Sequence, residues 1–380
     1  MSRPLRALVA LVLLAGPAAA QSSEFGVRGL GIPLRPISVR ARATGGAFGL
    51  FDAESGMNPA SIALVGFVTA SFQTVQGWRH SETPAGSASV QDNRYPGILV
   101  SGPISGTPFS LALSASGYTD RNFELASRDT LLLRGAQVEV FDTLISHGGL
   151  SDLRAALGWR QSKAVQWGFA LHLITGSNRI DSRRAFGDTL YGAAREQFTM
   201  SYLGVGASAG VTARLGRAIT LAGMVRADNH LTVERDSLSF GTTRLPMTIS
   251  GGARVQLTDR LLVAGSAVYR NWSVSDKDLV AQGGIGSTNT TEINGGLEFV
   301  PDPKRPTRRP IRLGIYHASL PFPLERGDDA SETGVSLGSA LRFVGGRASL
   351  DFALERIWRK AGPGFKERAT LLTLGIGIRP

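Results

Sequence analysis

From Leu64 onward the sequence repeatedly alternates, residue by residue, between apolar and polar or small side chains. The segment RASLDFALE at 347–355 is the clearest case, and 152–160, 167–173 and 372–379 follow the same pattern. Successive side chains of a β-strand point to opposite faces, so each segment has one apolar face and one polar or small face. The pattern predicts an all-β chain.

Two architectures give such strands: a soluble sandwich that buries the apolar face, and a membrane barrel that turns this face to lipid. The predicted strands run about ten residues or more, near the ~9–11 that a tilted transmembrane strand requires. The other face mixes Gly, Ala, Ser and Arg, as in the lumen of a barrel. These features favour a closed antiparallel transmembrane β-barrel.

Connection lengths give the topology. Short turns near 105–107, 161–163, 215–216, 258–259 and 344–346, and a Pro-rich connection at 301–306, alternate with long polar stretches. We expect the long stretches to be external loops: 77–94, 120–147, 177–197, 229–244, 273–290 and 321–333. Short periplasmic turns and longer external loops are typical of single-chain barrels. Fourteen strands are therefore predicted: 64–76, 95–104, 108–119, 149–161, 164–176, 198–214, 217–228, 245–257, 260–272, 291–300, 310–319, 334–343, 347–358 and 367–379.

The segment 36–64, PISVRARATGGAFGLFDAESGMNPASIAL, interrupts this regularity. It is rich in Gly, Ala and Ser and has neither helical nor strand periodicity. A closed sheet has an interior that something must fill. We expect this segment to be a plug. Asn58 and Pro59 predict a rigid corner in it, since Asn bonds its neighbouring backbone in an Asx-turn and Pro fixes φ; a plain turn before the first strand is the alternative.

The run Arg40–Phe48, followed by Asp52-Ala53-Glu54 and Asn58-Pro59-Ala60, resembles the N-terminal signature of the FadL/TodX-type outer-membrane transport proteins. Later stretches also resemble sequences of this family, but less specifically: Leu245-Pro246, Trp272-Ser273, Arg312–Tyr316 and Leu320–Phe322. Two positions depart from the family pattern, where Thr44 replaces a Met and Met57 replaces an aromatic residue.

The resemblance implies a fourteen-stranded barrel with an N-terminal hatch in its lumen, and uptake of hydrophobic compounds such as long-chain fatty acids. The implied hatch and gating residues are Arg42, Gly45, Gly46, Phe48, Asn58, Pro59 and Ala60. In this family a kink in the wall near strands two and three makes a side exit. Pro96, Pro103 and Pro108 are the candidates here, since Pro cannot donate to the ladder; Pro103 and Pro108 equally fit the two sides of a turn.

The first twenty residues read as a secretory signal peptide: Arg3 and Arg6, an apolar run, then Ala18-Ala19-Ala20. The expected domains are this leader (1–20), the hatch (21–63) and the barrel (64–380). Without the leader the net charge of +11 loses two arginines and becomes +9. The remaining Arg residues are scattered rather than clustered, which argues against nucleic-acid binding. The sequence has no Cys, so no thiolate or disulfide chemistry is expected.

Catalytic and metal patterns are weak. Gly206-Ala207-Ser208-Ala209-Gly210 matches G-x-S-x-G, which requires a strand–turn–helix elbow, but it lies inside a predicted strand and close packing explains its small residues better. The five histidines are far apart in sequence, and His172 is expected to line the lumen. Gly283–Gly286 falls in a predicted loop, so a phosphate-binding loop is not expected.

The sequence thus predicts a non-enzymatic channel in the cell outer membrane that needs no cofactor or metal. Its expected partners are a hydrophobic small-molecule ligand, outer-membrane lipids and the barrel-assembly machinery, with no nucleic acid. Two alternatives stay open: a scaffold barrel similar to the PorV-type proteins that escort secreted substrates, and an outer-membrane lipid hydrolase.

Overall fold

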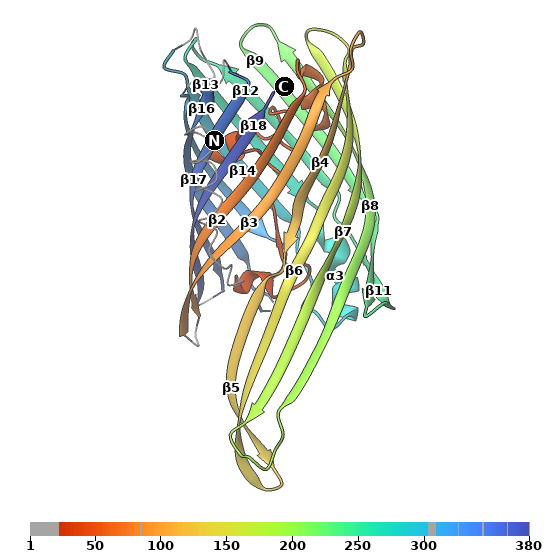
Figure 1. Cartoon of the computed structure of the whole chain (residues 1–380), viewed down its shortest axis with the longest axis vertical. Helices are drawn as coiled ribbons and strands as arrows, with labels where there is room; N and C mark the ends of the chain where they lie inside the picture. Colours follow the sequence, from red (N-terminus) through yellow and green to blue (C-terminus); the bar gives the residue numbers. More distant parts are fainter. Residues whose placement is uncertain are drawn as a thin grey trace, which may run out of the picture.

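A computed structural model describes residues 23–83, 86–302, 309–325, 327–343, 346–362 and 364–379. The predicted signal peptide, residues 1–20, lies outside these ranges. Fourteen antiparallel strands form a closed barrel, in which the last strand pairs with the first (Figure 1). They are β2 (Thr69–Thr83), β3 (Gly86–Pro103), β4 (Phe109–Asp120), β6 (Ala136–Arg160), β7 (Val165–Phe186), β8 (Ala194–Leu215), β9 (Ile219–Asp228), β12 (Thr248–Gln256), β13 (Leu261–Arg270), β14 (Thr290–Phe299), β15 (Ile311–Leu320), β16 (Ala330–Phe343), β17 (Ala348–Ala361) and β18 (Phe365–Ile378).

The barrel confirms the predicted fold class, and each of the fourteen predicted strands overlaps one observed strand. The alternation of apolar and polar side chains along each strand determines which face points out of the barrel and which points into the lumen. On β17, Leu354 and Trp358 point outward and are about two-fifths exposed, whereas Glu355 points inward and is fully buried. The β18–β2 pairing closes the sheet, and the ring of exposed apolar side chains around it is that of a membrane barrel.

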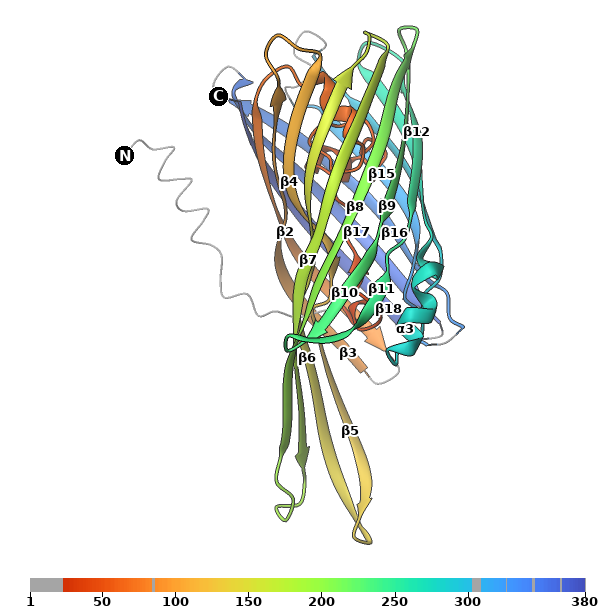
Figure 2. The ribbon, with the colours of Figure 1, turned by 90° about the vertical axis from the view of Figure 1, so that its right-hand side faces the viewer.

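Four of the stretches expected to be external loops form strands instead. The connection between β4 and β6 contains β5 (Phe123–Leu133), which pairs with the outer half of β6; β2, β3, β7 and β8 also continue well beyond their predicted ends. A second hairpin, β10 (His230–Arg235) and β11 (Leu238–Arg244), pairs with β8. Apolar residues such as Leu231, Val233 and Leu132 do occur in these strands, but charged and turn residues between them make the stretches read as polar loops, while the backbone ladder continues. Figure 2 shows β5–β8 projecting far beyond the barrel.

Short helical turns complete the fold. The N-terminal segment holds η1 (Glu24–Gly26), the two-residue strand β1 (Ile32–Pro33), α2 (Val39–Ala43) and η2 (Pro59–Leu64). The β13–β14 connection holds η3 (Trp272–Ser275) and α3 (Asp276–Ala281). No helix in the described part of the chain is long and apolar enough to cross a membrane.

Ion pairs on the projecting strands give the first testable expectation. Arg195 and Arg183 donate hydrogen bonds to Asp181 and hold the pKa of this carboxyl below its usual range. Arg184 likewise lowers the pKa of Asp142, with its Nη2 2.6 Å from Oδ2 of the carboxylate. A depressed folded-state pKa stabilises the extension above the unfolded value of 3.8, and this contribution is lost as pH falls through the lower folded value.

The protection of the amides of residues 178–197 against exchange, measured relative to their intrinsic exchange rate at each pH, should therefore be the same at pH 7 and pH 5 and decrease below about pH 4. The protection of the barrel ladder around Leu354 should not change. A loss of protection in residues 178–197 already between pH 7 and pH 5 would contradict this assignment.

Candidate functional site

The N-terminal segment lies inside the barrel, where it contacts the inward faces of strands on both sides of the lumen (Figure 1). The helical turn η2 packs against β6, β7 and β8, and α2 packs against β15, β16 and β17. Phe48, Asn58 and Ala60 are fully buried. The structure therefore places the residues predicted to form the hatch inside the barrel.

A row of inward glycines on three neighbouring strands receives η2. Gly158, Gly168 and Gly210 face one another directly in the β6–β7–β8 register. A Cβ on Gly158 would lie 2.7 Å from the backbone nitrogen of Ala63, and Cβ atoms on Gly168 and Gly210 would overlap Pro59 and Asn58. The absent side chains let the backbone of η2 lie directly on the wall.

A second glycine contact lies on the opposite wall. Gly296 and Gly314 are register partners on β14 and β15, and Cβ atoms on them would overlap Thr44 and Gly45. Gly45 itself has φ +65° and would place a Cβ 2.6 Å from the nitrogen of Ile315. Gly46, at φ +97°, completes this tight turn after α2. These two positions require glycine both for conformation and for close approach.

The corner at Asn58 has the predicted geometry. Its Oδ1 accepts a hydrogen bond from the Ala60 N–H at 3.0 Å, which closes the Asx-turn and caps η2, and Pro59 occupies the first helical position. Its Nδ2 donates to the Leu50 carbonyl at 3.0 Å and to Thr212 Oγ1 on β8 at 3.3 Å. One side chain thus joins two parts of the segment to the wall.

Three arginines of the segment bind carboxylates of the wall. Arg35 Nη2 lies 3.0 Å and Arg42 Nη1 3.3 Å from the two carboxylate oxygens of Glu355, which is completely buried. Arg40 makes a two-pronged pair with Glu298 at 2.7 and 2.9 Å. Removing one partner of such a buried pair costs about 3–5 kcal/mol, because the other charge stays buried. Of these residues, the sequence pointed to Arg42 as a gating residue and gave no indication of the ion pairs with Arg35, Glu298 and Glu355.

The wall is interrupted next to β1. Strands β3 and β4 pair only between Gly97–Pro103 and Ser110–Ser116. Beyond that point β3 stays with β2, while β1 takes its place on β4, pairing Ile32 with Asp120 and Pro33 with Thr119.

The ion pair Arg94–Asp120, at 2.6 Å, joins the two separated strands. Pro96 lies at this break, next to the last paired residue, Gly97, and opposite an irregularity in β2. Pro103 ends β3 and Pro108 precedes β4, so these two flank the short turn.

A cavity of about 60 Å³ lies between the segment and the wall near this break. Its apolar lining comes from Leu34, Met57, Met224, Val268 and Trp272, and its polar lining includes Asp152, His172, Ser208 and Arg226. A second cavity, of about 320 Å³, lies at the end of the barrel with the short turns and is lined by Phe51, Asp52, Leu64 and Arg254 among others. Ligand pockets for drug-sized molecules measure about 300–1,000 Å³, so the inner cavity is closed to such a ligand in this conformation.

The polar side of the inner cavity brings together residues that are far apart in sequence. His172 Nε2 lies 2.9 Å from Ser208 Oγ, and its Nδ1 lies 3.0 Å from both oxygens of Asp152. Arg226 Nη1 pairs with Asp152 at 2.6 Å. The contacts have the order of a serine-hydrolase triad, yet Ser208 lies in mid-strand, as predicted, and its neighbours' N–H groups belong to the β7–β8–β9 ladder. Without an elbow or free backbone donors for an oxyanion, the group is a polar lining.

Arg154 differs from the other lumen arginines. Its side chain is buried, but none of its three guanidinium nitrogens has a hydrogen-bond partner among the described residues, and the same holds for Arg226 Nη2. Arg154 lies beside His172 in the β6–β7 register and close to Gly56 of the segment. A buried cation without hydrogen bonds is costly, so this position favours an anion brought in from outside. Among the described residues no group of three His, Cys, Asp or Glu is placed to hold a metal ion.

The glycine contacts generate a direct test. Replacing Gly314 by Ala places a Cβ against Gly45, and overpacking of this kind costs about 1–3 kcal/mol. We expect the N-terminal segment to loosen while the barrel still folds, seen as faster proteolysis within 39–64 at an unchanged heat-induced gel shift. Gly265→Ala is the matched control, since its Cβ would point outward with its nearest atom at 3.7 Å. Equal proteolysis in both variants would contradict the assignment.

Comparison with known proteins identifies structures that share this fold. No family model matches the sequence, and no curated protein matches it. Solved structures do match. A Pseudomonas aeruginosa FadL homologue has a TM-score of 0.64 at 14% identity and covers 92% of this chain and 99% of its own. The Pseudomonas putida toluene transporter TodX gives 0.61 at 11% identity, covering 91% and 99%. The Ralstonia pickettii toluene transporter TbuX gives 0.58 at 14%, covering 91% and 99%. The chain therefore has the fold of the FadL homologue and the toluene transporters, as the sequence resemblance implied.

Proposed function

We propose that this protein is an outer-membrane channel through which hydrophobic small molecules are taken up without chemistry. The observation that carries the proposal is the break between β3 and β4, which lies beside a cavity with one apolar and one polar side and is covered by the same N-terminal segment that fills the lumen. The similar folds of two toluene transporters support it. A leader at 1–20, a hatch at 21–63 and a barrel at 64–380 remain the proposed organisation.

The ligand enters from the side of the long hairpins. A buried apolar cluster there joins the barrel to the segment and includes Leu30, Met200, Tyr202, Trp272 and Phe322. The rings of Trp272 and Phe322 meet edge to face at 5.1 Å. Apolar surface of this kind lowers the free energy of an apolar ligand relative to water.

Passage requires the N-terminal segment to act as the hatch. The inner cavity holds about 60 Å³, too little for a fatty acid, and Pro33, Leu34 and Met57 form part of its lining. A shift of these residues enlarges the cavity. The same shift withdraws β1 from β4 and exposes the break at Pro96, through which the ligand leaves the wall. Diffusion of this kind needs no cofactor.

The proposed substrate class is long-chain carboxylic acids rather than neutral hydrocarbons. Arg226 lines the inner cavity together with Met57, Met224 and Val268, and Arg154 lies next to this lining as the register partner of His172. The unpartnered nitrogens of the two arginines offer hydrogen bonds to a carboxylate, and the three apolar residues offer contact to a chain. Hydrogen bonds to charged groups contribute about 1.5–3 kcal/mol each. A neutral aromatic hydrocarbon accepts no such charge-assisted hydrogen bond from these two arginines.

A scaffold role similar to that of the PorV-type proteins is the second candidate. It is favoured by one observation, the β5–β8 extension, which projects far from the barrel and includes exposed apolar residues such as Leu132. Recovery of a large protein partner on the intact barrel, lost on shortening this extension, together with absent ligand uptake, would favour the scaffold over the channel.

The hatch is tested at its corner. Replacing Asn58 and Pro59 by Ala removes the η2 cap and two buried hydrogen bonds, a loss of about 2–3 kcal/mol. We expect faster uptake of labelled long-chain acid by cells, because the closed hatch is weakened, with unchanged barrel assembly. Asn229→Ala, an exposed position near the long hairpins, should have no effect. Unchanged uptake in the double variant would count against a gating hatch.

The substrate class is tested at Arg154. Arg154→Gln removes the charge, and we expect binding of a long-chain carboxylate to the purified protein to weaken about tenfold or more. Binding of the corresponding long-chain alcohol, measured with the same variant, should change little. Equal losses for acid and alcohol would show that Arg154 shapes the lumen without recognising the carboxylate.

A further inference from the structure

A group of basic residues lies on the outward face of the barrel beside the β17–β18 hairpin. Arg356 and Lys360 come from β17 and Lys366 and Arg368 from β18; we refer to these four residues as the rim cluster. All four side chains are exposed. Lys360 and Lys366 stand directly opposite each other in the β17–β18 register. Like charges directly opposite each other on one face of a sheet destabilise it. An anion bound between the two lysines would remove this repulsion.

The described residues do not supply enough negative charge for that role. Arg356 donates to the Thr370 hydroxyl at 2.6 Å. Glu82 on β2 is the register partner of Lys366 and lies 3.8 Å from Arg368, and it is the one carboxylate with a recorded ion pair to the cluster. Four cations and one carboxylate leave an excess of three positive charges. The structure records no ion pair for Lys360 or Lys366 within the ranges that it describes.

The exposed arginines of the projecting strands show that this arrangement is not general. Arg184 pairs with Asp142 at 2.6 Å, and Arg128 pairs with Glu139 at 2.8 Å. Asp181 and Glu196 likewise bind arginines of the neighbouring strands. The protein neutralises those cations itself, whereas the rim cluster keeps its charge available.

The depth of the cluster on the barrel identifies its surroundings. Trp358 is the register partner of Arg368, and Trp78 that of Thr370. The following outward rows toward the opposite rim are apolar, with Leu354 beside Leu372 and Phe352 beside Leu374. Aromatic residues mark the interface between the hydrocarbon and headgroup regions. Lysine and arginine at this level extend their heads into the polar region while their stems stay on the apolar surface.

We propose that the rim cluster binds the phosphate groups of a phosphorylated lipid in the membrane leaflet on the side of the long hairpins. Ammonium groups attract phosphate as point charges and guanidinium groups bind it in a two-pronged manner. A phosphate between Lys360 and Lys366 removes their mutual repulsion, and Arg368 on the next row closes the site. The lipid anchors this sector of the wall, which β2 and β3 separate from the break proposed as the path of the transported ligand. The site depends on the orientation of the barrel and not on what the channel transports.

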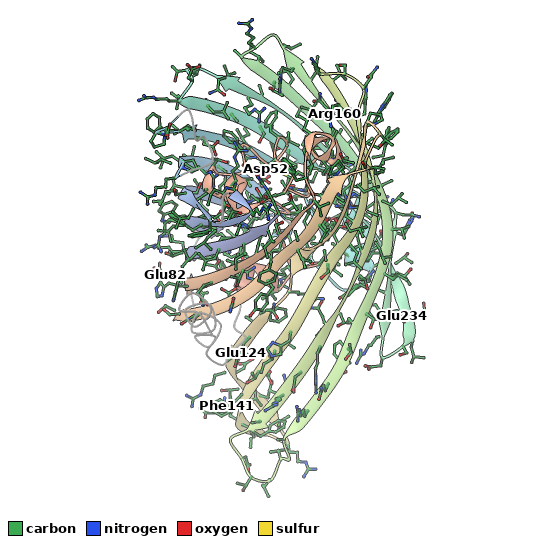
Figure 3. All side chains as sticks on the ribbon, turned by 45° about the horizontal axis from the view of Figure 1, so that its top comes forward. Asp52, Glu82, Glu124, Phe141, Arg160 and Glu234 are labelled. Atoms are coloured by element: carbon green, nitrogen blue, oxygen red, sulfur yellow. The ribbon has the colours of Figure 1, made fainter. Side chains whose placement is uncertain are left out.

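The test uses the full barrel in a non-ionic detergent, titrated with lipid A, a glycolipid that carries two phosphate groups. The triple variant Lys360→Ser, Lys366→Ser and Arg368→Ser should bind at least about tenfold more weakly, since each basic residue near a lipid surface contributes about 1 kcal/mol. The matched control removes three exposed cations at the opposite rim: Arg160→Ser, Lys163→Ser and Arg260→Ser. It should bind as the parent does. Figure 3 labels Glu82, which lies beside the cluster at one rim, and Arg160, which lies at the opposite rim.

Three results would overturn the proposal, provided that all proteins keep the same heat-induced gel shift. The first is unchanged affinity of the triple variant for lipid A. The second is equal affinity of the parent for dephosphorylated lipid A, which removes phosphate as the recognised group. The third is displacement of lipid A by inorganic phosphate at the same concentration, which makes the site one for free phosphate. Binding that depends on lipid phosphate and on the cluster, in contrast, supports it.

Discussion

The structure depends on filling the lumen that forms when the sheet closes into a barrel. Fourteen strands satisfy one another's hydrogen bonds by closing, and closure leaves an interior that side chains from the wall do not occupy by themselves. The N-terminal segment fills it through two different contacts. On the β6–β8 side the contact is steric, with η2 lying on Gly158, Gly168 and Gly210. On the opposite side it is largely ionic, through Arg35, Arg40 and Arg42.

This division matters for movement. An apolar core resists displacement because moving it exposes hydrophobic surface to water. Ion pairs in a polar lumen are different, since water that enters on opening can solvate both partners and recover much of the lost interaction. In the proposed hatch movement, breaking the Arg–Glu pairs to β14 and β17 and leaving the glycine seat at β6–β8 would therefore cost less than the complete burial of the segment suggests.

The sequence was sufficient for the strands and insufficient for what lies between them. Alternation of Leu354 with Glu355 reports which face meets lipid, so the fourteen strands and the lumen position of His172 were predictable. The projecting hairpins were missed because in strands such as β5 charged residues separate the apolar ones, from Phe123 and Leu125 to Leu131–Leu133, and obscure the alternation. The glycine row was missed because it appears only once the register sets Gly158, Gly168 and Gly210 side by side.

Charge partners were the least predictable part of the lumen. Glu355 lies more than three hundred residues from Arg35 and Arg42, and its place in an alternating strand says only that it faces inward. The contact of His172 with Asp152 and Ser208 depends equally on the stagger of three strands. Inward glycines at matching distances from the turns of neighbouring strands are the sequence signal that would have located the seat of η2.

The break in the wall and the inner cavity belong to one mechanical unit. Pro33 pairs with Thr119 at the free edge of β4 and also lines the cavity, while the next residue, Leu34, donates its N–H to the Tyr118 carbonyl at 2.9 Å. An uncovered strand edge facing hydrocarbon is unfavourable, because its backbone groups lack partners, so β1 has to remain in place whenever the lumen is empty. In the proposed function, a ligand that enlarges the cavity by displacing Leu34 would weaken this pairing at the same time. Occupancy of the lumen and opening of the wall would thereby be coupled through three consecutive residues, Ile32 to Leu34, without a signal having to cross the barrel.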